Sequence, residues 1–136
     1  MTDFETAYCQ TSYVVDDGPV KFTIRLDGGN ESLYEFLAET NATTWAFLTA
    51  YNPLGLELPA SENKIRQAEL IEILERAKYI YFNGHGIGDD GLWEPEPSIF
   101  VLDILRDTSI NLAKRFSQNA ILWGEKTLAP ELIWCS

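Results

Sequence analysis

Polar side chains near the ends of the predicted helices and strands are the groups best suited to chemistry in this sequence. Amides donate and accept hydrogen bonds, and a guanidinium group presents a planar fork that matches a carboxylate or a phosphate. The residues concerned are Asn52, Asn63, Arg66, Arg115, Gln118 and Asn119. Such a set could bind a small anion or a nucleotide. The alternative is that these side chains satisfy buried backbone groups where the chain turns, with the arginines paired to Glu94 or Glu96.

Four carboxylates lie in the irregular stretch GHGIGDDGLWEPEP, which we expect to be a loop over residues 84–97. They are Asp89, Asp90, Glu94 and Glu96. The pattern of a calcium-binding loop is absent, so a solvated acidic loop is favoured over a metal site. Glu94 and Glu96 could serve as a general acid and base. The glycines do not match a dinucleotide-binding fingerprint and His85 has no second histidine, so we expect neither metal nor cofactor.

The charge of the chain excludes several classes of partner. With 21 acidic and 10 basic residues, the net charge is −11, which disfavours direct binding to nucleic acid or to an anionic membrane. An acidic surface could also act as a decoy that inhibits a DNA-binding protein. The chain has no apolar run of membrane-spanning length and its first residues do not resemble a signal peptide, so we expect a cytoplasmic protein.

Hydrophobic patterns predict the elements that must position these residues. The predicted strands cover residues 7–15, 20–26, 43–51, 78–83, 98–104 and 119–124, with a short terminal strand at 132–135. The predicted helices cover residues 32–39, 61–77 and 107–116. In the second helix Asn63, Arg66 and Gln67 lie one and two turns before Leu70 and Leu74, at the edge of the buried stripe.

Residues 98–124 form the centre of the predicted fold. Two unbroken apolar runs joined by a short helix are typical of buried parallel strands with a crossover connection. We therefore expect a single α+β domain over residues 1–136. It should contain one mixed sheet of five to seven strands with about three helices, including a C-terminal βαβ unit.

Four stretches of the sequence resemble the bacterial domain-of-unknown-function 3293 family: AFLTAYNP (46–53), SENKIRQAEL (61–70), WEPEPSIFVLDI (93–104) and RFSQNAILWG (115–124). The resemblance extends from about residue 8 to residue 124. The family pattern coincides with the residues Asn52, Pro53, Glu62, Asn63, Arg66, Trp93, Glu94, Glu96, Ser98, Arg115, Phe116, Gln118, Asn119 and Ala120. It implies a small, free-standing bacterial protein and no assigned activity.

Three functions follow from these observations. The leading hypothesis is a non-catalytic binding domain whose polar cluster recognises a small anionic ligand or a protein segment, with Trp93 covering an apolar part. The second is an enzyme that uses Glu94 or Glu96 beside Arg66 and Arg115 on a phosphorylated or carboxylate substrate. The third is the acidic decoy. The sequence favours the first, and it names no ligand or partner.

Overall fold

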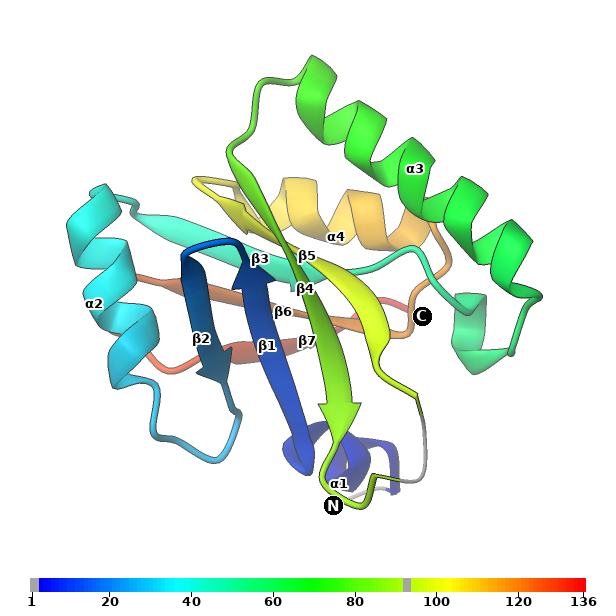
Figure 1. The fold of residues 1–136 in the computed structure, drawn as a ribbon, viewed down its shortest axis with the longest axis horizontal. Helices are drawn as coiled ribbons and strands as arrows, with labels where there is room; N and C mark the ends of the chain where they lie inside the picture. The colour runs from blue at the N-terminus through cyan, green and yellow to red at the C-terminus, as the bar shows by residue number, and fades with distance from the viewer. Residues whose placement is uncertain (1–2, 92–93) are drawn as a thin grey trace.

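The computed structural model describes residues 3–91 and 94–136 of the chain. Its helices are α1 (Asp3–Cys9), α2 (Glu31–Thr40), α3 (Ala60–Arg76) and α4 (Arg106–Arg115), with a 3₁₀ turn, η1, at Pro53–Gly55. Its strands are β1 (Thr11–Asp17), β2 (Val20–Ile24), β3 (Thr44–Leu48), β4 (Tyr81–Gly88), β5 (Glu96–Leu102), β6 (Ala120–Glu125) and β7 (Glu131–Trp134). The α+β class is confirmed, and the described residues contain four helices rather than about three (Figure 1).

All seven strands belong to one sheet with the order β2-β1-β4-β5-β3-β6-β7. Each of its six strand pairs is antiparallel, so the prediction of a mixed sheet is wrong. β5 and β6 both pair antiparallel with β3 and so point the same way, but β3 separates them. The expected βαβ unit is therefore not formed by neighbouring strands. Both β5 and β6 pair with β3 instead of with each other, because β3 is equally apolar and lies between them.

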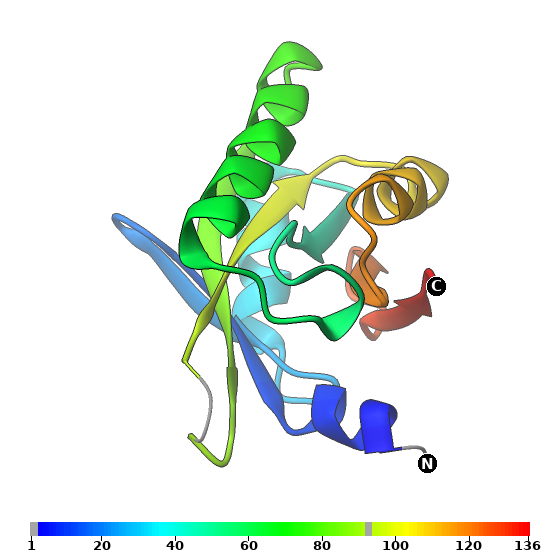
Figure 2. The same ribbon diagram turned by 90° about the vertical axis from the view of Figure 1, so that its right-hand side faces the viewer.

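The sheet carries a separate hydrophobic core on each face. On one face α3 and α4 cover strand residues such as Ala46, Val101 and Trp123. On the other face α2 covers an aromatic layer that includes Trp45 and Phe100. Figure 1 and Figure 2 show α3 and α4 together on one side of the curled sheet and α2 on the other. The alternation of residues along β3 and β5 assigns neighbouring side chains to opposite cores.

The glycine-rich stretch that we predicted as a loop is largely a β-hairpin. Residues 84–88 continue β4, and β5 begins at Glu96, so the connection is shorter than expected. His85 is half-buried in β4 rather than exposed in a loop. Glycine is required at position 84, because an added Cβ there would lie 2.3 Å from the carbonyl oxygen of Val14. Glycine lets β4 and β1 approach closely enough to pair.

The beginning of the chain differs from the prediction in another way. Residues 7–15 were expected to form one strand, whereas α1 precedes β1, which begins at Thr11. Within residues 7–15 the β-branched residues that favour a strand begin at Thr11, and residues 7–10 contain none. The predicted antiparallel hairpin of β1 and β2 is confirmed.

Candidate functional site

Two asparagines that lie 11 residues apart, at either end of one loop, bind each other and the backbone between them. The Oδ1 of Asn63 accepts a hydrogen bond from the backbone N–H of Asn52 at 2.8 Å. The Nδ2 of Asn63 donates to the Oδ1 of Asn52 at 2.7 Å and to the carbonyl of Leu58. The Oδ1 of Asn52 also accepts from the backbone N–H of Leu58 at 3.0 Å. The pair therefore closes the loop of residues 52–58 onto the first turn of α3.

Arg66 joins the segment that leads into this loop to the end of α4. Its Nε donates to the carbonyl of Ala50 at 2.8 Å, and one of its terminal nitrogens donates to the carbonyl of Phe116. The guanidinium carbon also lies 5.8 Å from the centroid of the Phe116 ring, within the range of a cation–π contact. The positive charge thus lies beside backbone carbonyls at the C-terminal end of α4, where a cation is favourable.

Gln67 and Gln118 are two further buried amides that bind the backbone near this loop. Gln67 accepts from the N–H of Ala50 at 2.8 Å and donates to the carbonyl of Pro97 at 3.3 Å. Gln118 donates to the carbonyl of Tyr51 at 2.9 Å. The residues Asn52, Asn63, Arg66, Gln67 and Gln118 are called the polar frame below. Every member binds backbone groups, so these contacts match the alternative in which polar side chains satisfy the turning chain.

The polar frame holds a loop that displays apolar side chains to solvent. Asn52 and Leu54 adopt left-handed backbone conformations with φ of 47° and 54°, which non-glycine residues rarely adopt. The N–H of Leu54 donates to the carbonyl of Ser117 at 2.7 Å, which fixes this conformation. Leu54 and Leu56 are 54% and 63% exposed, and Ile65 on the first turns of α3 is 62% exposed. These three residues are called the loop face below.

The other predicted residues lie outside the frame. Arg115 and Glu94 are exposed, Asn119 is half-buried beside Gly55, and Trp93 lies outside the described residues. None of the ion pairs among residues 3–91 and 94–136 joins either arginine to Glu94 or Glu96. The structure thus unites four of the nine predicted site residues, Asn52, Asn63, Arg66 and Gln118.

Glu96 lies in a different environment from the polar frame. It is half-buried at the start of β5, and burial raises the pKa of its carboxyl to about 7. Burial, followed by the negative charge of Glu96, raises the pKa of Tyr8 to about 12. A carboxyl group that titrates near neutrality can act as an acid or a base. None of the described contacts places a second catalytic group beside it.

Asp89 from the acidic stretch takes part in an ion-pair cluster. Arg25 donates to both oxygens of Asp89, at 2.8 and 2.9 Å, and to both oxygens of Asp27. The hydrogen bonds from Arg25 hold the pKa of each aspartate below its ordinary value. Arg25 therefore fastens the tip of the β4–β5 hairpin to the turn after β2. In the described part of the chain, no three His, Cys, Asp or Glu side chains are grouped as metal ligands.

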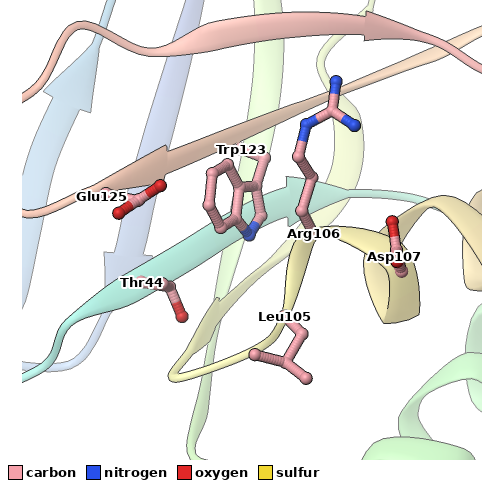
Figure 3. A pocket seen from close by; sticks show the side chains of 6 residues that line it. All are labelled: Thr44, Leu105, Arg106, Asp107, Trp123 and Glu125. Atoms are coloured by element: carbon pink, nitrogen blue, oxygen red, sulfur yellow. The ribbon is translucent and has the colours of Figure 1, made fainter.

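A surface depression of about 450 Å³ lies at the N-terminal end of α4, away from the predicted residues (Figure 3). It is lined by Thr44, Leu105, Arg106, Asp107, Trp123 and Glu125. Several of its polar groups already have partners. Thr44 and Trp123 donate to the carbonyl of Ile104, and Arg106 pairs with Glu131 at 2.6 Å.

Sequence reasoning underestimated Gln67 and Thr49. Gln67 was placed at the edge of the buried stripe of α3 but not among the site residues. Its spacing of four residues from Asn63 was the available signal, because that spacing puts both amides on one helix face. Thr49 also donates to the carbonyl of Pro97, at 2.7 Å. Nothing in its local sequence marks that contact, which joins residues 48 positions apart.

Comparison with known proteins gives a family and no activity. Within the described residues, no helix combines the length and apolar character needed to cross a membrane. No curated protein and no solved structure matches the chain. Residues 48–121, more than half of the chain, match DUF3293, a family described as a protein of unknown function. This segment contains the whole polar frame and the loop face, and the chain belongs to the DUF3293 family.

Proposed function

We propose that this protein is a non-catalytic interaction domain that binds another protein through the loop face. The observation that supports the proposal is the exposure of Leu54 and Leu56 on a loop fixed by the polar frame, and of Ile65 on the helix α3 that follows the loop. Exposed apolar side chains that gather on a surface are characteristic of interaction sites. In this proposal the amides and the guanidinium group of the polar frame serve to fix the loop that binds the partner.

A fixed loop favours binding, because less conformational entropy is lost when a partner docks. The backbone of the loop is hydrogen-bonded to α3 through Asn63 and to the end of α4 through Ser117. Its two non-glycine residues with left-handed conformations, Asn52 and Leu54, fix the direction in which the chain continues. A loop that served only as a connection would not require this number of long-range contacts.

The charge of the chain limits the kind of partner. At −11, two copies of the protein repel each other, and an acidic partner is repelled as well. The occupant that we propose is therefore a segment of a different protein, apolar at its centre and neutral or basic at its edges. The exposed acids Glu57 and Glu62 adjoin the loop face and suit a basic rim.

Selection of displayed peptides tests this proposal. A library of random peptides is selected on the immobilised wild-type protein, and the recovered peptides are measured against two variants. We expect binding to fall by at least about tenfold in Leu54→Ser/Leu56→Ser. The matched control is Leu105→Ser/Leu128→Ser, which changes two leucines that are 68% and 62% exposed elsewhere. Peptides that bind both variants equally would contradict the proposal.

A small anion is a second candidate ligand, and Arg115 supports it. This residue is exposed at the C-terminal end of α4, and it enters none of the ion pairs of the described residues. Inorganic phosphate at about 100 times its dissociation constant would stabilise the protein by about 2.7 kcal/mol. Thermal unfolding of wild type and Arg115→Ala with phosphate tests this ligand. Arg66→Ala is a poor probe because it breaks the polar frame.

A further inference from the structure

The two outer strands of the sheet, β2 and β7, each have one edge that pairs with no other strand of the described residues. Such an edge presents the backbone N–H and C=O groups of every second residue, and these groups can pair with an extended segment of another chain. The two edges of this sheet differ in how well their own side chains protect them.

The edge of β2 is protected by its own sequence. The buried side chain of Asn30 accepts from the N–H of Arg25 at 2.8 Å and donates to the carbonyl of Arg25 at 2.8 Å. One amide thus occupies both backbone groups that a neighbouring strand would use. Lys21 and Thr23 alternate with Arg25 and face the same way, and both are exposed. A lysine on an edge strand opposes pairing with another chain.

The edge of β7 lacks this protection in the part of the chain that the structure describes. The N–H of Cys135 donates to the carbonyl of Asn119 at 2.7 Å, in line with the pairing of β7 and β6. Residues that face the partner alternate along an antiparallel strand, so Leu132 and Trp134 direct their N–H and C=O groups away from β6. This outward-facing side of β7 is called the open edge below.

Apolar side chains line the open edge. Trp134 is 41% exposed, although its ring meets the ring of Tyr8 edge-on at 5.5 Å. Leu132 is half-buried and packs against the aromatic core. The two side chains lie on one face of the sheet because they are two residues apart. An added strand would therefore meet apolar surface at alternate positions.

The end of β7 adjoins the loop face. Asn119, which binds the N–H of Cys135, also lies beside η1, because a Cβ added to Gly55 would lie 3.5 Å from its Nδ2. The N–H of Leu54 donates to the carbonyl of Ser117, two residues before Asn119. Figure 1 shows the C-terminus near η1. A segment bound to the loop face can thus continue along the open edge without crossing the molecule.

We propose that the partner segment bound to the loop face adds a strand to the open edge of β7. This inference rests on the proposed function and specifies the conformation of the partner. The backbone of an extended segment pairs with the outward N–H and C=O groups of Leu132 and Trp134, and its alternate side chains pack beside theirs. Because the net charge is −11, the intervening positions suit lysine or arginine, and a second copy of this chain is disfavoured.

Amide hydrogen exchange followed by NMR tests the added strand. The probes are peptides selected from a random displayed library on the immobilised wild-type protein. A peptide whose binding depends on Leu54 and Leu56 should, at saturation, slow exchange of the Leu132 and Trp134 amides at least about tenfold, because both gain an acceptor. The amides of β2 serve as the internal reference and should be unaffected.

Proline variants provide a second measurement. Proline at an outward-facing position removes an N–H that the sheet does not use. Leu132→Pro and Leu132→Ala both remove the leucine side chain, and only proline removes the N–H. We expect the peptide to bind Leu132→Pro at least about tenfold more weakly than Leu132→Ala. Thr23→Pro, the same change on the edge of β2, should keep wild-type affinity. If Leu132→Pro fails to fold, Trp134→Pro and Trp134→Ala give the same comparison at the end of the strand.

The outcomes separate this inference from the proposed function. A peptide that requires Leu54 and Leu56 but leaves the open edge unprotected, and binds Leu132→Pro as well as Leu132→Ala, overturns the added strand alone. A peptide that protects the open edge but binds Leu54→Ser/Leu56→Ser with wild-type affinity overturns the proposed function, and with it the continuity required here. Recovery of no peptide overturns both. Protection of the open edge that rises with concentration in the free protein identifies a second copy as the occupant and overturns the inference.

Discussion

The polar frame and Glu96 both lie at the start of β5, but the polar groups of the frame are hydrogen-bonded whereas the charge of Glu96 is not compensated. The carbonyl of Pro97 accepts hydrogen bonds from Thr49 and Gln67, at 2.7 and 3.3 Å. The carboxyl of the preceding residue, Glu96, is half-buried, and burial raises its pKa. The frame stabilises one conformation at every pH near neutrality because its members bind backbone groups. Glu96 makes stability depend on pH because its charge is not compensated.

This difference shows that a polar residue near the end of a strand can have either a structural or a functional role. Asn63 and Gln67 are buried, yet their hydrogen bonds leave little capacity for a ligand. Glu96 retains its capacity for protonation, so it can respond to the surroundings. We therefore attribute function to the loop face and to Glu96 rather than to the polar frame itself. Four predictions sharpen or break this comparison, and they are ordered by expected effect.

The largest effect should come from Gly84→Ala, which tests why β4 contains glycine opposite Ser98 of β5. The new Cβ would lie 2.3 Å from the carbonyl oxygen of Val14 and 3.3 Å from the ring of Phe47. The oxygen belongs to the backbone of β1 and cannot move without breaking strand pairs, so we expect a loss of about 3 kcal/mol in the free energy of unfolding. Urea denaturation measures it.

Gly86→Ala is the matched control in the same strand. Its nearest neighbour is the Cγ2 of Thr11 at 3.8 Å, an ordinary contact, so we expect a change below about 1 kcal/mol. Equal losses in the two variants would mean that glycine is required in β4 for a reason other than close approach to β1.

Asn63→Ala should have the next largest effect, because it removes a buried member of the polar frame. The substitution leaves the N–H of Asn52 without its acceptor and deprives the carbonyl of Leu58 of a donor. We expect a loss of about 2 kcal/mol in the free energy of unfolding. The exposed neighbour Lys64→Ala should change it by less than about 0.5 kcal/mol. A small loss in Asn63→Ala would show that the frame is free for a ligand.

The sequence predicted the apolar strands and the helix faces well because both signals are local. The runs that became β3, β5 and β6 were identified, and the buried face of α3 was predicted down to Asn63 and Gln67. Sheet order was not predictable in this way. Whether β5 pairs with β6 or with β3 depends on contacts between distant segments, and all three strands have the same apolar composition.

One segment was predicted wrongly, and the binding partners of the polar cluster could not be predicted, for specific physical reasons. Residues 84–88 were predicted as loop because glycine has a low intrinsic preference for strands. The close approach of Gly84 to Val14 selects glycine there, and only the fold reveals that contact. The polar cluster was predicted as a group, but its targets are backbone carbonyls and N–H groups. Every residue has such groups, so the sequence does not show where they will lie.

The third prediction concerns Glu96→Gln and the pH dependence of stability. Since the folded pKa of Glu96 is raised from 4.5 to about 7, folding of the wild type is progressively penalised as the pH rises between these values. Glutamine does not ionise, so the variant should exceed the wild type in stability by about 1–2 kcal/mol at about pH 8 and approach it near pH 4.5. Glu94→Gln is the exposed control and should give no such difference. A constant offset for Glu96→Gln at both pH values would indicate a packing effect.

The smallest effect on stability should come from Leu54→Ser/Leu56→Ser. That result would sharpen the contrast between the polar frame, which stabilises the fold, and the loop face, which does not. Both side chains are more than half exposed, so their replacement removes little buried apolar area. We expect a change below about 0.5 kcal/mol in the free energy of unfolding, measured in urea. Residues that contribute little to folding and yet interrupt the acidic surface with apolar groups are better explained by binding than by structure. A loss comparable with that of Asn63→Ala would show instead that these leucines pack within the domain, and the loop face would then be part of the frame.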